Sequence, residues 1–327
     1  MSGRFANLAP GFEAARPVVS VVQAEAVLAD WFEAPVVLTS SGRAALLLCF
    51  QQFSLNRYRD TISLPRMISA CVLDAVIRCG FPVDAASGQA ATLTLLYHQY
   101  GFQQLFRPEG LVGEDICHSF FASPSSGARM WAGQAAVFSL PKFFRTSGMV
   151  GGIVVPDRQL ADQLRQARDG SSVSQLVPRS SEQILAPGEI EAAYLDKLLH
   201  PRADPAALGG FPATLDGLRE AGAARREFLD KMLQASAHLP VPEGWSRLLQ
   251  TTLPFVFPVF GPEQPLRQLE ARLRELSVNS GIYKIDSARR MDSPFFMTAA
   301  LLPCHNFMPE TFQDSILDCI DTFRPFW

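Results

Sequence analysis

The sequence predicts an α/β protein in which a mostly parallel sheet is covered by helices on both faces, with a small α+β domain after it. Three observations predict this fold. Short β-branched segments alternate with helix-like segments as far as GGIVVP. The pattern is then helical and charged from about Arg158 to Lys231, and changes again near His238 to mixed strands and helices. Such alternation is typical of a sheet with crossover helices. We therefore expect a large domain over residues 1–235 and a small one over 236–327.

The elements follow from the spacing of apolar residues. In the large domain, helices are predicted in VVQAEAVLADWF, GRAALLLCFQQF and ISACVLDAVIRCG, the last ending at Gly80. Strands are predicted in VVLTSS, TISLP, FPVDAA, ATLTLLYH, LVGED, AAVFSL and GGIVVP. In the small domain, TLPFVFPVFG and the region around ALLPC predict strands. EQPLRQLEARLRELSVNSG and PETFQDSILDCIDTF predict amphipathic helices capped by Gly281 and Pro309.

Composition excludes several classes of function. The net charge is -3 and no basic run is present, which argues against nucleic-acid binding. No uninterrupted apolar stretch reaches about 18 residues, so no membrane span is expected. The first residues lack the features of a signal peptide, and we expect a cytoplasmic protein. None of the six cysteines forms a CxxC pair, so no metal site is predicted and the cysteines are expected to be buried.

Ligands of such sheets bind outside the carboxyl ends of the strands, so polar residues that follow strands are the candidates for a site. The segment LVGEDICHSF ends a strand at Glu114 and Asp115, with His118 three residues later. A half-buried carboxylate at this place could keep the ring nitrogen of a pyridine protonated, which makes the ring an electron sink. The alternative is that Asp115 caps a following helix.

A second segment, AAVFSLPKFFRTSGMVGGIVV, places Ser139 and Lys142 directly after a strand. A lysine that forms a Schiff base must be partly desolvated. Apolar neighbours could provide that environment, whereas an ordinary loop lysine would be solvated. Lys142 is also the only lysine before Lys197. The apolar neighbours are Leu140, Pro141, Phe143 and Phe144.

The third segment, LTSSGRAALLL, runs from a strand through Ser40, Ser41 and Gly42 into a helix. Free backbone N–H groups at a helix start, with nearby hydroxyls, form an anion site. Arg43 could add a forked contact to a phosphate.

Together these segments resemble the DegT/DnrJ/EryC1/StrS family of fold-type-I, pyridoxal-phosphate-dependent sugar aminotransferases. SSGRAAL is similar to the family's Gly-Thr-Ala-Ala phosphate turn, and GEDICHS to its Glu-Asp-Ala-Ala-His/Gln segment. ISLPRMISACVLDAVIRCGFPVDA resembles its unit of a proline, a helix and Ala-Gly-x-x-Pro-Val, and LLYHQYG its Val-His-x-Tyr-Gly strand end. VFSLPKF followed by GG resembles its Ser…Lys…Gly-Gly segment, and LLPCHNFMPETF its Leu-Pro-x-His segment.

The resemblance implies a role for each matching residue. Asp115 would pair with the ring nitrogen of pyridoxal 5'-phosphate, and His118 would lie beside its ring oxygen or phosphate. Lys142 would be the Schiff-base lysine and the proton shuttle. Ser139 would bind the phosphate together with the turn at Ser41, Gly42 and Arg43. His200 and Arg202 would reach the site of a partner subunit, so that the resemblance implies a homodimer.

Three departures separate this chain from the family pattern. The family's lysine usually follows its serine by five residues, which is the position of Phe144, whereas Lys142 follows Ser139 by three. The aromatic residue that normally stacks on the pyridine ring is replaced near Ser69. The threonine of the turn is replaced by Arg43. We interpret Lys142 as a shifted catalytic lysine.

The activity that the resemblance implies is amino transfer to a keto sugar, nucleotide-linked in most members, or to a similar carbonyl, with glutamate as the donor. It places the chain in sugar biosynthesis. Two alternatives stay open. The same electron sink serves dehydratases, and the three departures would also fit a non-catalytic member that has lost the cofactor.

Overall fold

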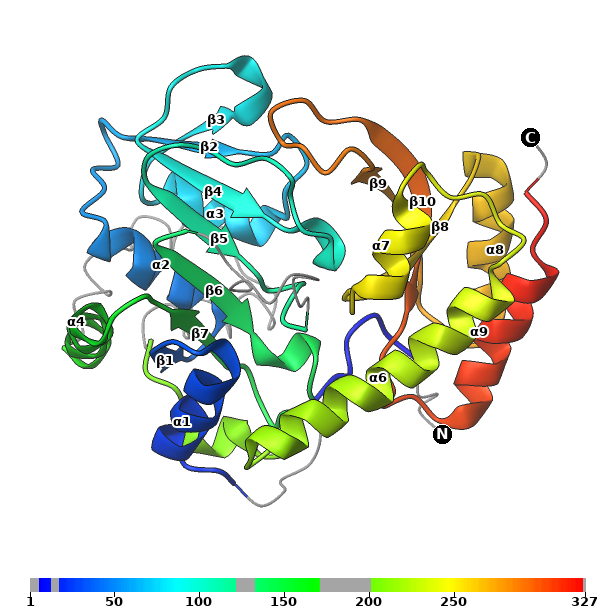
Figure 1. The fold of residues 1–327 in the computed structure, drawn as a ribbon, viewed down its shortest axis with the longest axis horizontal. Coiled ribbons are helices and arrows are strands. Elements are labelled where there is room, and N and C mark those ends of the chain that lie inside the picture. Colours follow the sequence, from blue (N-terminus) through cyan, green and yellow to red (C-terminus); the bar gives the residue numbers. More distant parts are fainter. Residues whose placement is uncertain (1–5, 13–17, 122–132, 171–200, 326–327) are drawn as a thin grey trace, which may run out of the picture.

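The computed structural model describes residues 6–12, 18–121, 133–170 and 201–325. Its larger sheet has seven strands in the order β1-β7-β6-β5-β4-β2-β3 (Figure 1). β7 runs antiparallel to both neighbours, and the other pairs are parallel, so the predicted mostly parallel sheet is confirmed. The strands are β1 (Val36–Thr39), β2 (Thr61–Leu64), β3 (Phe81–Asp84), β4 (Leu93–Tyr97), β5 (Val112–Asp115), β6 (Ala135–Ser139) and β7 (Gly151–Val154).

Helices cover both faces of this sheet because its strands are apolar on both sides. In β6, Ala136 and Phe138 belong to the core on the side of α1, whereas Ala135 and Val137 belong to the core on the side of α2 and α3. This is the two-residue period of a strand buried on both faces. The helices of this part are α1 (Val21–Phe32), α2 (Gly42–Gln52), α3 (Ala70–Ile77) and α4 (Arg158–Asp169).

The rest of the chain builds a three-stranded antiparallel sheet in the order β8-β10-β9, packed with α8 and α9. The long helix α6 contacts α1 at one end and α9 at the other, and so runs beneath both sheets (Figure 1). The elements are α6 (Leu215–Ala235), α7 (Trp245–Thr251), β8 (Val256–Phe260), α8 (Glu263–Glu275), β9 (Gly281–Asp286), β10 (Phe296–Pro303) and α9 (Glu310–Thr322).

The small sheet corrects one prediction from the sequence. The helix expected to be capped by Gly281 ends at Glu275, because Ser277 takes the left-handed backbone conformation with φ 59°. Gly281 instead begins β9, which pairs with β10. Pro309, by contrast, is the N-cap of α9, as expected.

Two glutamine side chains join the two parts of the molecule. Gln99, after β4, donates to the carbonyl of Lys284 at 3.0 Å and accepts from the N–H of Asp286 at 3.0 Å. The side chain of Gln104 accepts from the N–H of Met291 at 2.9 Å. These bonds hold β9 and its following turn against the carboxyl end of β4.

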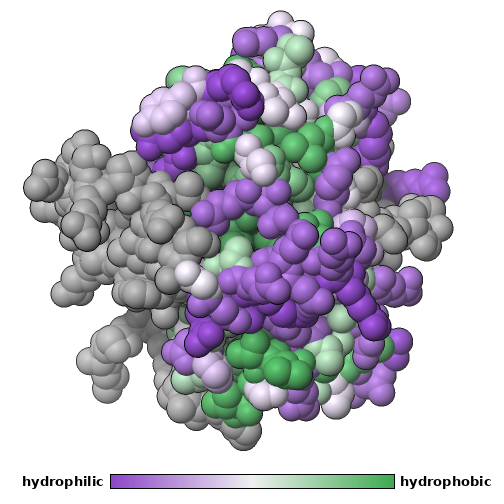
Figure 2. All heavy atoms as spheres, turned by 90° about the vertical axis from the view of Figure 1, so that its left-hand side faces the viewer, coloured by the Kyte–Doolittle hydropathy of each residue, from purple (hydrophilic) through white to green (hydrophobic). Residues whose placement is uncertain are grey.

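The outer surface of the large part is charged where α4 lies. The polar residues of α4 face outward, and Figure 2, which views the molecule from that side, shows a mainly hydrophilic surface across the middle. Among the residues that the structure describes, no helix combines the length and apolar character of a membrane span.

Candidate active site

A cavity of about 330 Å³ lies at the carboxyl ends of β4, β5 and β6. Tyr97, Asp115 and Ser139, the last residues of these three strands, all line it. Phe255, just before β8, closes it from the side of the small sheet, and Phe12 closes it from the N-terminal segment. The remaining lining residues are Ala9, Gly11, Ser41, Gly42, Arg43, Leu46, Ser69, Cys71, Val72, Cys117, Pro141, Lys142, Met149 and Val150.

The start of α2 forms one wall. Ser41 is its N-cap, and the Ser41 hydroxyl accepts from the N–H of Ala44 at 3.2 Å. The strand register sets Thr39, Gly151 and Ser139 side by side on β1, β7 and β6. A Cβ on Gly151 would stand 2.3 Å from the nitrogen of Gly42, so only glycine lets the helix start approach the sheet this closely. The result is a helix N-terminus beside a serine hydroxyl, which is a site for an anion.

Asp115 is buried beneath the cavity. Its Oδ1 accepts from the N–H of Cys117 at 2.8 Å. No helix follows it in the described residues as far as Phe121. The bond therefore closes a turn, and the alternative prediction that Asp115 caps a helix was wrong.

Glu114, the neighbour of Asp115 at the end of β5, bonds to His98, which follows β4. Oε2 of Glu114 lies 2.9 Å from Nε2 of His98. Nδ1 of His98 accepts from the N–H of Gln104 at 3.1 Å, so Nε2 carries the proton and donates to Glu114. Both side chains of this pair are buried, and the bond fixes the end of β5 against the residues after β4.

Lys142 lies in a single 3₁₀ turn, Leu140–Lys142, that directly follows Ser139. Its Nζ is 2.7 Å from Nε2 of His118. The ring of His118 is stacked on Phe255 with centroids 4.7 Å apart and on Tyr100 at 5.8 Å. Burial, and then the charge of Lys142, lower the pKa of His118 well below its ordinary value. His118 is therefore neutral near pH 7, and its Nε2 accepts from Lys142.

Lys142 follows Ser139 by only three residues, and this spacing determines which side chain reaches the cavity. Lys142 lines the cavity, whereas Phe144 is buried in an aromatic cluster with Phe120 and Phe211. Phe144 thus belongs to the core on the other side of the backbone.

Ser69 is the N-cap of α3 and lines the cavity. Its hydroxyl lies 3.3 Å from Sγ of Cys71, and Tyr97 lines the same cavity. His200 lies outside the described residues. Arg202 pairs with Asp169 at 3.1 Å.

The cysteines differ from the prediction at one position. Five of the six are buried, as expected, but Cys71 is half-buried and lines the cavity. The prediction failed at Cys71 because this residue stands in the first turn of α3, at the end of the helix that faces the cavity.

Sequence reasoning also missed Tyr97 and Phe255. Tyr97 could have been found, because it ends a predicted strand beside the one that carries Asp115. Phe255 could not, because it comes from a segment far along the chain and no pattern in the sequence connects it with His118.

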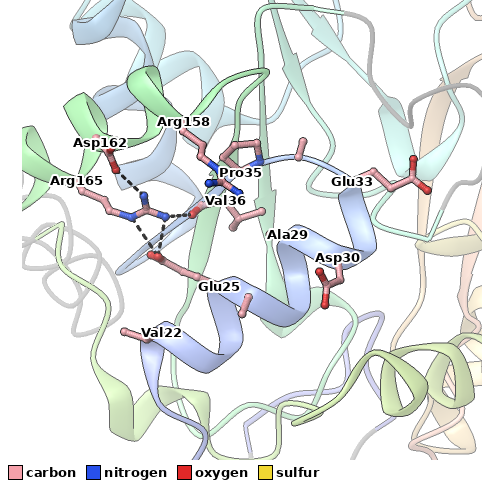
Figure 3. Close-up of a pocket in the computed structure, with 12 residues that line it drawn as sticks. Val22, Glu25, Ala29, Asp30, Glu33, Pro35, Val36, Arg158, Asp162 and Arg165 are labelled. Atoms are coloured by element: carbon pink, nitrogen blue, oxygen red, sulfur yellow. Dashed lines mark hydrogen bonds and ion pairs between the residues drawn. The ribbon is translucent and has the colours of Figure 1, made fainter.

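A larger hollow of about 780 Å³ lies between α1 and α4 (Figure 3). Figure 3 shows Arg165 bonded to Glu25, Asp162 and Val36 in this hollow. Arg165 binds Glu25 at 3.1 Å, Asp162 at 3.0 Å and the carbonyl of Val36 at 2.9 Å. Glu25 also accepts from the N–H of Leu38 at 2.9 Å. This network joins α1, β1 and α4, and it serves the fold.

Comparisons with known proteins agree with this architecture. Residues 26–177, just under half of the chain, match the model of a family described as "Putative PLP-dependent aminotransferase". No protein with curated annotation matches the sequence. Among solved structures, a DegT/DnrJ/EryC1/StrS aminotransferase from Brucella abortus is 14% identical, with a TM-score of 0.65 over 93% of this chain and 90% of that one.

Two further structures extend the likeness. DesV of S. venezuelae, solved in complex with a ketimine intermediate, is 18% identical, with a TM-score of 0.65 over 98% of this chain and 90% of its own. PseC of Helicobacter pylori, an aminotransferase involved in the biosynthesis of pseudoaminic acid, is 14% identical, with a TM-score of 0.64 over 98% and 100%. The fold of this chain is that of the DegT/DnrJ/EryC1/StrS aminotransferases.

The family model and the fold together indicate a PLP-dependent aminotransferase, where PLP is pyridoxal phosphate. The groups around the cavity fit this cofactor. A carboxylate, a primary amine and a helix start with a serine hydroxyl face one space, and Gly151 leaves room for the turn that an anion would approach. These are the groups that a pyridinium, an aldehyde and a phosphate each require.

Proposed function

We propose that this protein transfers an amino group to a keto sugar, nucleotide-linked or free, or to a similar carbonyl, with glutamate as the amino donor. The observation that carries the proposal is the meeting of Lys142, Asp115 and Ser139 in one cavity at three neighbouring strand ends. The sugar class is supported by similar structures, which include a "Putative sugar aminotransferase" from Streptococcus pneumoniae.

Each residue has a role that follows from its place. Asp115, held by the N–H of Cys117, would hold the protonated ring nitrogen. The start of α2 and Ser139 would bind the phosphate. PLP supplies an electron sink that weakens bonds at the carbon bearing the nitrogen.

Lys142 would be the attachment point of the cofactor and would move protons at its Nζ. His118, as a neutral acceptor 2.7 Å away, would orient that amine. The resemblance puts Ser69 near the position of the family's stacking aromatic residue, and we propose that Ser69 and Tyr97, which both line the cavity, contact the ring instead.

The test is borohydride trapping followed by peptide mapping. We expect the pyridoxyl group on Lys142, and its loss in Lys142→Ala. Lys231→Ala is the matched control, because Lys231 is exposed and pairs with Glu227 on α6. Label on Lys197, Lys231 or Lys284, or on no lysine, would overturn the assignment. Only the absence of label from every lysine would favour the non-catalytic alternative.

The substrate pair needs a separate measurement. Glutamate alone should convert the bound cofactor to its amine form, with loss of the visible absorption band, and a keto sugar should restore it. If glutamate converts the cofactor to its amine form but no keto sugar restores the absorption band, the proposed acceptor is rejected. Release of water from the sugar instead of amino transfer would favour the dehydratase alternative.

We also propose that the protein is a cytoplasmic homodimer, with its two domains meeting near residue 235. In such a dimer His200 and Arg202 would approach the partner's site. Sedimentation that shows only a monomer of 35.9 kDa would reject the dimer.

A further inference from the structure

We propose that Arg225 is a positioning residue that holds the cavity wall against the pair formed by Lys142 and His118. The proposal rests on the proposed function of that pair. Arg225 lies in α6 and is only 2% exposed. Arg225 contacts neither Lys142 nor His118. Its guanidinium instead contacts the backbone of Phe255 and the ring of Phe143, which are neighbours of that pair.

The guanidinium binds the backbone just before β8. Its Nη2 donates to the carbonyls of Pro254 and Phe255, both at 2.7 Å, and its Nε donates to Pro254 at 3.2 Å. The planar fork of arginine can make these bonds together, whereas the single ammonium of lysine cannot reproduce them. The bonds therefore fix the backbone that carries the ring of Phe255.

That ring is the direct neighbour of the proposed catalytic pair. It stacks on His118 at 4.7 Å, and Nζ of Lys142 lies 5.7 Å from its centroid. The guanidinium also lies 5.0 Å from the centroid of Phe143, the residue after Lys142. Arg225 thus supports the pair from both sides.

An electrostatic interaction extends from Arg225 toward the N-terminal wall. Burial is the main cause that lowers the pKa of His305, the charge of Arg225 adds to it, and Nε2 of His305 donates to the carbonyl of Asn7 at 2.8 Å. Residues 9–12, which follow Asn7, supply Phe12 and two smaller residues to the cavity lining. One buried side chain therefore binds the segment before β8 and lies over Phe143, and its charge acts on the histidine that bonds the N-terminal segment.

The energetics favour a positional role over a stabilising one. In the described part of the chain no carboxylate pairs with Arg225, and its Nη1 has no hydrogen-bond partner. Burial of a charge without a counter-ion destabilises the fold, and an apolar residue of similar volume is often more stable at such a place. The hydrogen bonds to Pro254 and Phe255 offset part of that cost and set the geometry of the wall.

The experiment compares Arg225→Lys and Arg225→Met with Arg226→Met. Arg226 is the matched control: it is the next residue of α6 and also donates to a carbonyl before β8, that of Thr252 at 2.7 Å, but it is partly exposed. We expect both Arg225 variants to lower kcat by up to about a hundredfold, as small misplacements do. KM for the amino donor should change much less. The midpoint of the visible absorption band against pH should shift, and Arg226→Met should match the wild type.

A second readout needs neither cofactor nor turnover. Cys71 is the half-buried cysteine of the cavity, so its alkylation rate by iodoacetamide in the protein without PLP reports on the packing of the wall. We expect faster alkylation in both Arg225 variants, at equal far-UV circular dichroism. If Arg225→Met does not fold, Arg225→Lys and Phe255→Leu carry the test, and both should alkylate faster than Arg226→Met.

The outcomes are distinct. Alkylation rates, kcat and pH midpoints equal to those of Arg226→Met would overturn the role of Arg225. Wild-type protein that traps no cofactor on Lys142 would reject the proposed function, and faster alkylation of Cys71 in the Arg225 variants would still support the positioning of the wall.

Discussion

Nζ of Lys142 donates a hydrogen bond of 2.7 Å to Nε2 of His118, a histidine that burial keeps neutral. The two residues come from different strand ends, β5 and β6, and meet because those strands are parallel neighbours. A partly buried amine needs a hydrogen-bond partner, and a neutral imidazole provides one without fixing a negative charge beside the amine.

The first prediction concerns that acceptor. His118→Gln should keep most activity, because the amide oxygen can still accept from Lys142, and the family segment that GEDICHS resembles carries His or Gln at this place. His118→Leu should lose about ten- to a hundredfold in kcat, since a hydrogen bond to a charged group contributes roughly 1.5–3 kcal/mol. Steady-state measurement of kcat for the two variants and the wild type tests this prediction. Equal rates for the two variants would show that the hydrogen bond has no part in turnover.

The second prediction concerns Asp115. Asp115→Asn should fold normally, because an amide oxygen can still accept from the N–H of Cys117. Turnover should fall by at least about tenfold, as the charge-assisted contact with the ring nitrogen is lost. Near-normal turnover with unchanged thermal unfolding would assign Asp115 to the turn alone.

Much of this arrangement could be predicted from the sequence because it depends on strand ends. Asp115, Ser139 and the turn at Gly42 each follow an apolar β-branched run, and parallel strands bring such ends together. The sequence also favoured Lys142 over Phe144, and the structure supplies the physical reason. The 3₁₀ turn after Ser139 brings the third residue, and not the fifth, to the cavity.

The parts that could not be predicted depend on tertiary contacts. Strand β9 has exposed residues in its middle and no clear alternation, so its pairing with β10 decides its structure. Arg225 looked like one of several charged residues on a helix. Its burial becomes visible only when the segment before β8 packs against α6.

The third prediction concerns the glycine behind the helix start. Gly151→Ala should weaken PLP binding strongly, because its Cβ would stand 2.3 Å from the nitrogen of Gly42 and push the anion site away from the sheet. Gly113→Ala is the control, since a Cβ there meets only side chains at 3.7 Å and beyond. PLP titration followed by absorbance measures both. Equal affinities would mean that the phosphate is bound elsewhere.

The last prediction concerns stability against pH. Burial is the main reason that the pKa of His305 falls to about 4, and the charges of Arg225 and Arg145 add to it. Above the ordinary histidine pKa of about 6.5, His305 is neutral whether the chain is folded or unfolded. As pH falls from there toward 4, only the unfolded chain takes up the proton, so the free energy of unfolding decreases.

The loss attributable to His305 should be on the order of 3 kcal/mol by pH 4. His118 shifts in the same direction and adds to the total in the wild type. In His305→Gln, whose amide can still donate to the carbonyl of Asn7, the slope of unfolding free energy against pH between 4 and 6.5 should be smaller. Urea unfolding at several pH values measures it, with the exposed His238→Gln as control. An unchanged slope in His305→Gln would show that this histidine takes up its proton in the folded protein as readily as in the unfolded chain.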